Sequence, residues 1–223
     1  MIKAAIFDMD GLLINSEPFW QNAEMEIFKT VGVPLTREMC AQTVGLRIED
    51  AVKYWHARYP WYDKSISHIA EEVVWGVIKQ VRNEGTLMEG VNYILEFLQA
   101  KNIRMALASS SSYDIINTVV DVFNLRRYFE FVYSAEEEKL GKPHPGVYLT
   151  TAAKLECLPR ECVAFEDSVT GLVSAKAAGI KAVAVPEPHE FYKTKYDFTE
   201  LKIPSLLAFK ENEWLAVNGI FAK

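Results

Sequence analysis

Cysteine is scarce in this 223-residue sequence, and the few cysteines form no recognisable pattern. Cys40, Cys157 and Cys162 are an odd number with no CxxC spacing, which argues against a disulfide framework or a cysteine-based metal site. The four histidines likewise share no metal-ligand spacing. We therefore expect reduced thiols in a reducing compartment, the cytoplasm.

Long apolar runs and basic runs are also missing. No stretch reaches the roughly 18 apolar residues that a membrane span requires, and the apolar N-terminus ends at Asp8, too early for a signal peptide. Lysine and arginine number 24 against 30 aspartates and glutamates, so the formal charge is −6. We therefore expect a soluble protein that binds neither membranes nor nucleic acid. A small anionic substrate can bind only where local positive charge outweighs the overall negative charge of the protein.

Short apolar runs alternate with helical patterns over much of the chain. The runs are continuous, as in strands that helices cover on both faces. They are residues 2–7, 103–108, 131–133, 162–165 and 181–185. The helical patterns between them are residues 91–101, 112–123, 145–156 and 169–178. This order predicts an α/β fold with a Rossmann-like, doubly wound parallel sheet.

Residues 16–88 break this rhythm, because they contain no convincing strand. Ser16, followed by Glu17 and Pro18, is a typical start for a helix. We therefore expect an inserted helical domain. Its amphipathic helices are predicted over residues 17–31, 36–43, 48–58 and 66–83.

The predicted division assigns residues 1–15 and 89–223 to an α/β core and residues 16–88 to the helical insertion. Chain crossings between the two are expected near residues 12–16 and 84–90. The weakly patterned C-terminal stretch is expected to hold a short strand near 198–203 and a helix near 204–210.

Two carboxylates leave the first predicted strand together, in Asp8-Met9-Asp10-Gly11. Open α/β sheets bind their ligands at the carboxyl ends of the strands. There, one carboxylate can attack a phosphorus atom to form an aspartyl phosphate, while the other handles the proton of the leaving alcohol. Taken alone, this motif is weak evidence, because Asp and Gly are common in loops.

Three further features follow predicted strands. Ser109 opens a run of serines that can bind a phosphate oxygen before a helix, although taken by itself it is better explained as a helix cap. Lys142 lies between a glycine and two prolines that hold the chain extended, so it can neutralise a phosphate or simply lie at the surface. Glu166 and Asp167 are oxygen ligands of the kind that magnesium requires, or else they belong to a helix cap.

The order and strand-end positions of these features resemble the haloacid dehalogenase superfamily, in its branch of aspartate-nucleophile phosphatases. Residues 8–11 resemble the first family motif, Ser109 the second, Lys142 the third and Glu166-Asp167 the fourth. The resemblance spans nearly the whole chain. Residues 16–88 lie where one subgroup of the family carries a helical cap.

This resemblance implies a magnesium-dependent enzyme. Asp8 would attack phosphorus, and Asp10 would protonate the leaving alcohol and then activate water. Magnesium would be bound by Asp8, the backbone carbonyl of Asp10 and Asp167, with Glu166 bound directly or through water. The phosphate-binding residues that it implies are Ser109, Ser110 and Lys142.

Arg47 ends a segment, residues 43–47, that resembles the substrate-specificity loop of the family. We expect Arg47 either to reach the substrate or to be a surface residue at the start of a helix. The aromatic residues of the insertion are expected mainly to pack its small core, with one or two lining a sugar-sized pocket.

Within the capped branch, the sequence looks most like phosphatases of sugar phosphates, particularly 2-deoxyglucose 6-phosphate and hexitol phosphates. A β-phosphoglucomutase-like mutase is the alternative, although such mutases carry a histidine near the position of Trp20. A phosphonate hydrolase needs a cap lysine and is less favoured. A catalytically silent binding module is also less favoured, because the acids and the lysine are all present. We expect a monomer that acts on a small phosphorylated metabolite.

Overall fold

Six parallel strands form one sheet in the computed structural model, which describes residues 1–220. The strand order is β3-β2-β1-β4-β5-β6, and every neighbouring pair is parallel. The strands are β1 (Ala4–Phe7), β2 (Arg104–Ser109), β3 (Phe131–Ser134), β4 (Cys162–Glu166), β5 (Lys181–Ala184) and β6 (Leu201–Lys202). The predicted α/β fold with a doubly wound parallel sheet is confirmed.

The strand order reverses beside β1. The chain first builds β1, β2 and β3 towards one edge, then returns to add β4, β5 and β6 on the other side of β1. At the start of this crevice, the Asp8 N–H donates to the Phe165 carbonyl oxygen at 3.1 Å. Ligands of open α/β sheets bind at such a reversal, outside the carboxyl ends of the strands. Residues that follow β1 and β4 therefore face a common crevice.

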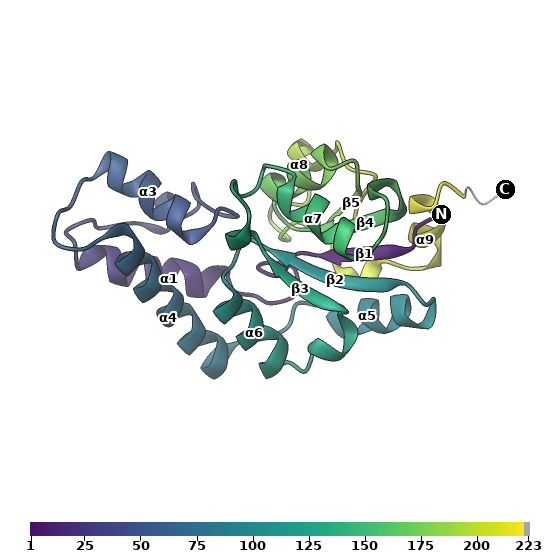
Figure 1. The fold of residues 1–223 in the computed structure, drawn as a ribbon, viewed down its shortest axis with the longest axis horizontal. Coiled ribbons are helices and arrows are strands. Elements are labelled where there is room, and N and C mark those ends of the chain that lie inside the picture. The colour runs from purple at the N-terminus through teal and green to yellow at the C-terminus, as the bar shows by residue number, and fades with distance from the viewer. Residues whose placement is uncertain (221–223) are drawn as a thin grey trace.

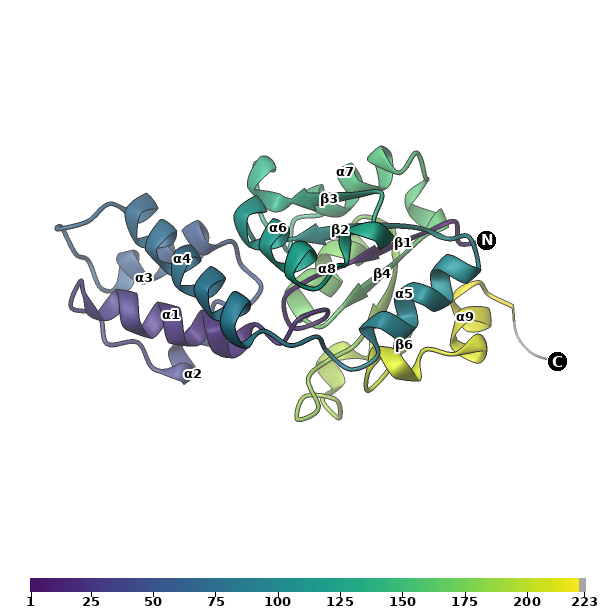
Figure 2. The ribbon, with the colours of Figure 1, turned by 90° about the horizontal axis from the view of Figure 1, so that it is seen from below.

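Helices cover both faces of the sheet, which explains why its strands are apolar throughout (Figures 1 and 2). In β1, Ala5 and Phe7 point into one layer of the core, and Ala4 and Ile6 into the other. The first layer includes α5 (Val91–Ala100), α6 (Tyr113–Val122) and α9 (Glu211–Val217). The second includes α7 (Gly146–Lys154) and α8 (Val169–Ala177).

Four helices between β1 and β2 gather at one end of the molecule, away from both termini (Figure 1). This helical group consists of α1 (Glu17–Lys29), α2 (Arg37–Cys40), α3 (Ile48–Arg58) and α4 (Ile66–Glu84). Helix α4 buries Ile69, Val73, Val77 and Val81, whose four-residue spacing makes one apolar face. Because α4 packs against α1, α3 and α6, it holds the group together and joins it to the sheet layer.

Two neighbouring chain segments connect the helical group to the sheet. The Asn15 N–H donates to the Thr86 carbonyl oxygen at 3.1 Å, and the Met88 N–H donates to the Leu13 carbonyl oxygen at 3.0 Å. Gly11 has a φ of +75°, a conformation that glycine adopts at little cost, and it begins the turn that leads into the first segment. Both segments lie in the ranges, near 12–16 and 84–90, where the sequence predicts the chain to cross between the two parts.

The C-terminal stretch differs from the prediction. The strand expected near 198–203 is present as β6, but the helix expected near 204–210 is wrong. A single 3-10 turn (Leu206–Ala208) occupies that region, and α9 begins after it. The reason is local capping, because the Glu213 carboxylate accepts a hydrogen bond from the Lys210 N–H at 2.9 Å and starts the helix there. The helix expected over 36–43 is likewise shorter, since α2 ends at Cys40.

Two further expectations concern the environment of the chain. Within residues 1–220, the helices are all too short or too polar to cross a membrane. The three cysteines are buried free thiols.

Candidate active site

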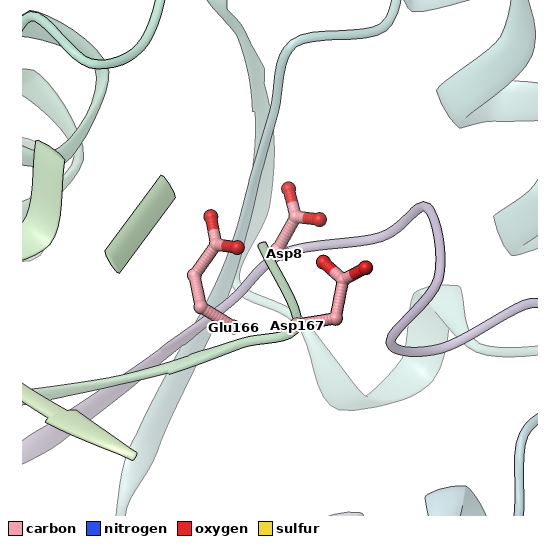
Figure 3. Close-up of side chains that lie close together, drawn as sticks. All are labelled: Asp8, Glu166 and Asp167. Carbon is pink, nitrogen blue, oxygen red and sulfur yellow. The ribbon is translucent and has the colours of Figure 1, made fainter. Parts of the chain in front are cut away.

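Three carboxylates converge at the carboxyl ends of β1 and β4. Asp8 directly follows β1, Glu166 is the last residue of β4, and Asp167 comes next. Each offers an oxygen that lies within 4.8 Å of oxygens from the other two. Figure 3 shows the three side chains turned towards one small space. The structure therefore brings Asp8 next to a pair of acids that lies more than a hundred residues later in the sequence.

Lys142 lies between two of these acids. Its Nζ donates to Asp8 Oδ1 at 2.6 Å and to Glu166 Oε1 at 2.7 Å, and it also contacts the Ala108 carbonyl oxygen at 3.3 Å. The Tyr148 hydroxyl donates to Glu166 Oε1 at 2.8 Å. Only 4 % of Lys142 is exposed, so its ammonium is fixed in the site rather than mobile in solvent. The surface-lysine alternative is thereby excluded.

Three acids share the single ammonium group of Lys142, and the pKa values of Asp8 and Asp167 are raised. Burial, followed by the Glu166 charge, raises the pKa of Asp8 to about 8, although Lys142 acts in the opposite direction. Burial and the charges of Glu166 and Asp8 also raise the pKa of Asp167 well above its ordinary value. Burial alone would lower the pKa of Lys142, but its two acidic partners outweigh that effect and the net direction is upward. Such a site is stabilised by a further positive charge.

The donor set fits a hard divalent cation. The cluster offers carboxylate oxygens alone, and magnesium and calcium prefer oxygen ligands. Two glycines leave room for these acids. A Cβ at Gly11 would lie 2.2 Å from Asp167 Oδ2, and a Cβ at Gly171 would lie 1.8 Å from Glu166 Oε1. Any larger residue at either position would displace a carboxylate from the cluster.

Asp10 lies beside this cluster and is held by hydrogen-bond donors from three segments. Ser16 Oγ and Trp20 Nε1 donate to its Oδ1 at 2.7 and 2.9 Å. Ser111 Oγ donates to Oδ2 at 2.7 Å, and Ser109 Oγ makes a longer contact of 3.4 Å. Trp20 belongs to the helical group, whereas Ser109 and Ser111 belong to the sheet side, so the orientation of Asp10 depends on both parts of the molecule.

The serines at the carboxyl end of β2 make two kinds of contact. Ser109 and Ser111 are buried and face Asp10, and Ser109 Oγ also accepts from the Ser111 N–H at 3.0 Å. Ser110 Oγ donates to the Gly45 carbonyl oxygen at 2.9 Å, so it contacts the helical group. Sequence reasoning missed Ser111, although the serine run from Ser109 to Ser112 marked the segment. It also missed Tyr148 and the Trp20 contact, for which the sequence offered no specific pattern.

A cavity of about 70 Å³ lies between this edge of the sheet and the helical group. Asp8, Asp10 and Lys142 line it from the sheet, and residues of α1, including Trp20 and Glu24, line it from the helical group. The cavity therefore joins the catalytic candidates to a surface that the sheet itself does not provide.

Arg47 lines a neighbouring cavity instead. Its Nε donates to Asp50 Oδ2 at 2.7 Å, and one terminal nitrogen donates to the Glu138 carbonyl oxygen at 2.8 Å. The side chain thus connects the start of α3 to the loop after β3. In this arrangement its contacts are to protein groups, and its expected contact with substrate stays a prediction.

Comparison with known proteins gives a consistent picture. A family model described as haloacid dehalogenase-like hydrolase matches residues 5–185. Hexitol phosphatase B of Escherichia coli K12 is 39% identical over 206 residues, which cover 92% of this chain and 93% of that protein. A phosphorylated carbohydrates phosphatase of Thermotoga maritima is 29% identical and covers 82% of this chain and 84% of its own length.

Solved structures agree on the fold. CbbY from Rhodobacter sphaeroides, in complex with phosphate, has a TM-score of 0.85 at 22% identity and covers 94% of this chain and 96% of its own. A β-phosphoglucomutase from Clostridium difficile has a TM-score of 0.84 at 23% identity and covers 98% of both chains. At these identities the likeness concerns the fold alone.

Proposed function

This chain belongs to the haloacid dehalogenase-like hydrolases, and on that premise we propose that it is a magnesium-dependent phosphatase of sugar or hexitol phosphates. The observation that carries the proposal is the buried Asp8 carboxylate, held 2.6 Å from Lys142 Nζ in a cluster of acids that fits a divalent cation. The names of the curated relatives, hexitol phosphatase B and phosphorylated carbohydrates phosphatase, support the substrate class.

In the proposed reaction, an oxygen of Asp8 attacks the phosphorus atom and the bond to the substrate oxygen breaks, leaving a phosphoaspartate. Asp10 gives a proton to the leaving alcohol and then takes one from the water that hydrolyses the phosphoaspartate. Lys142 supports the attack by countering the negative charge of the Asp8 carboxylate and the phosphate oxygens. Phosphoryl transfer depends mainly on such positioning and charge neutralisation.

We assign the remaining roles by the family resemblance and the local chemistry. Magnesium, when bound, neutralises charge on the transferring phosphoryl group. Its proposed ligands are Asp8, the Asp10 backbone carbonyl, Asp167 and Glu166. The proposed phosphate-binding residues are Ser109, Ser110 and Lys142, with Arg47 reaching the substrate from the helical group. The Arg47 role requires it to leave the carbonyl of Glu138.

The helical group is proposed to act as a cap domain, spanning residues 16–88, over a core of residues 1–15 and 89–223. The cavity between the two supports this division, since a cap that closes over the substrate excludes bulk water from the reaction. We further propose that the protein acts as a cytoplasmic monomer. Its three buried, free cysteines suit a reducing compartment.

A panel assay tests the proposal. Phosphate release is measured from sorbitol 6-phosphate, 2-deoxyglucose 6-phosphate, phosphoglycolate and 2-hydroxyethyl phosphate, with magnesium or with EDTA, for the wild type and Asp8→Asn. We expect magnesium-dependent release from the hexitol and sugar esters and none from Asp8→Asn. Release that survives EDTA or Asp8→Asn would contradict the proposal. Conversion of β-glucose 1-phosphate to glucose 6-phosphate without phosphate release would instead identify the mutase.

A further inference from the structure

One face of α1 forms a polar wall of the active-site cavity. Glu17, Trp20, Gln21 and Glu24 all line it, at the three- and four-residue spacing that puts side chains on the same side of a helix. Trp20 Nε1 donates to Asp10, so this part of α1 lies against the catalytic carboxylate. Glu24 lies about one turn further along, roughly 6 Å along the helix axis. It therefore faces the part of a substrate that is remote from the phosphate.

Glu24 is an unusual residue to bury. Only 7 % of it is exposed, and the other buried residues of α1, such as Ala23 and Phe28, are apolar. The Cys40 thiol lines the same cavity and lowers the pKa of Glu24, against the larger effect of burial. A thiol is a weak donor, and a carboxylate has room for several hydrogen bonds. Glu24 thus keeps unused acceptor capacity at the cavity wall.

The same wall carries two carboxyl groups, Glu17 and Glu24, and is negatively charged at a pH above their pKa values. Glu17 lies one to two turns before Glu24 on the same face, and its charge contributes to raising the pKa of Glu24 to about 7, after the larger effect of burial. Hydroxyl groups can donate to these carboxylates. A second anionic group on a substrate would meet like charge in a partly dehydrated space, where repulsion is stronger than in water.

We propose that Glu24 is a specificity-determining residue that accepts hydrogen bonds from hydroxyl groups at the end of the substrate remote from the phosphate, and that rejects substrates with a second anionic group there. This inference rests on the proposed phosphatase function and deepens it. Glu24 would favour monophosphates whose remaining part is uncharged and rich in hydroxyl groups, such as hexitol phosphates. Phosphorylated acids and bisphosphates of similar length would be disfavoured.

Two substrates that differ at one end test the proposal. Sorbitol 6-phosphate ends in a primary alcohol, whereas 6-phosphogluconate carries a carboxylate at the same position. The ratio of their kcat/KM values is measured at pH 8 for the wild type, Glu24→Gln and Glu26→Gln. Glu26 is exposed on the same helix and serves as the matched control. 2-Hydroxyethyl phosphate is too short to reach Glu24 and reports on the catalytic residues alone.

We expect the wild type to favour sorbitol 6-phosphate, and Glu24→Gln to lower that preference about tenfold, mainly through KM. Glu26→Gln should leave the ratio unchanged, and all three proteins should hydrolyse 2-hydroxyethyl phosphate equally. Glu24→Asp, which keeps the charge but shortens the side chain, should still reject 6-phosphogluconate while binding sorbitol 6-phosphate less tightly. This second variant provides an independent test if Glu24→Gln folds poorly.

Two results would overturn the inference, and they can be distinguished from each other. Unchanged ratios in both Glu24 variants, with normal hydrolysis of 2-hydroxyethyl phosphate, would show that Glu24 does not select the substrate while the phosphatase function stands. Absence of phosphate release from every ester in the wild type would remove the proposed function, and the inference with it.

Discussion

The indole Nε1 of Trp20 donates a hydrogen bond to Oδ1 of Asp10 at 2.9 Å. Trp20 belongs to α1 of the helical group, whereas Asp10 lies in the loop after β1, so this bond joins the two parts of the molecule at the proposed catalytic centre. Ser111 Oγ, from the sheet side, donates to the other oxygen of the same carboxylate. The orientation of the proposed acid and base therefore depends on how the helical group sits on the sheet.

Trp20→Phe should slow catalysis, because it removes the indole donor and keeps most of the side-chain volume. We expect kcat for sorbitol 6-phosphate to fall about tenfold, the scale of one hydrogen bond to a charged group. Steady-state kinetics measure the change. Trp75→Phe is the control, since Trp75 is 63% exposed on α4. Equal kcat values in the wild type and Trp20→Phe would show that the bond does not position Asp10 during the reaction.

Lys142→Met should destabilise the fold as well as abolish activity. The substitution leaves the buried carboxylates of Asp8 and Glu166 without their ammonium partner, and breaking a buried ion pair in this way costs about 3–5 kcal/mol. Urea unfolding in EDTA measures the free energy of unfolding. Lys53→Met, at an exposed lysine of α3, should change it by about 0.5 kcal/mol or less. If Lys142→Met lowered the free energy of unfolding as little as Lys53→Met does, the expectation would be contradicted.

Magnesium should stabilise the folded protein through the acidic cluster, independently of any turnover. A ligand that binds only the folded state raises the free energy of unfolding, by about 2.7 kcal/mol at a hundred times its Kd. We expect Tm to rise with magnesium concentration in the wild type and to stay constant in Asp167→Asn. Asp197→Asn, at an exposed surface aspartate, should behave as the wild type does. An undiminished rise in Asp167→Asn would remove Asp167 from the proposed ligands.

Glu24 should make the folded protein less stable as pH rises. Burial raises its pKa from 4.5 to about 7, so between these values the folded state holds a proton that the unfolded state has released. The stabilisation from this proton is complete below about pH 4.5 and is lost as pH rises through 7, a change of roughly 3 kcal/mol.

Urea unfolding at pH 5 and pH 8 tests this expectation. The free energy of unfolding of Glu24→Gln, relative to the wild type, should be higher at pH 8 than at pH 5, because the amide carries no charge to bury. Glu26→Gln should show no such pH-dependent difference. A constant difference between Glu24→Gln and the wild type at the two pH values would mean that Glu24 titrates near its ordinary pKa.

The sequence by itself determined the sheet and the chemistry after its strands. Continuous apolar runs specify strands buried on both faces, and parallel strands place whatever follows them at one edge. Asp8, Lys142 and the Glu166-Asp167 pair therefore met as predicted, because strand order and local pattern were sufficient to bring them together. The C-terminal helix escaped prediction, since its start depends on a single cap between Lys210 and Glu213 in a weakly patterned stretch.

Only the tertiary structure decided which side chains of the helical group face the site. The pattern of α1 predicts a helix, but the pairing of Trp20 with Asp10 and the burial of Glu24 depend on where that helix packs. Arg47 illustrates the same limit, because its bond to the Glu138 carbonyl oxygen joins segments that no local pattern relates. Contacts between distant segments follow from the packing of whole elements. No local sequence pattern at the contacting residues therefore predicts them.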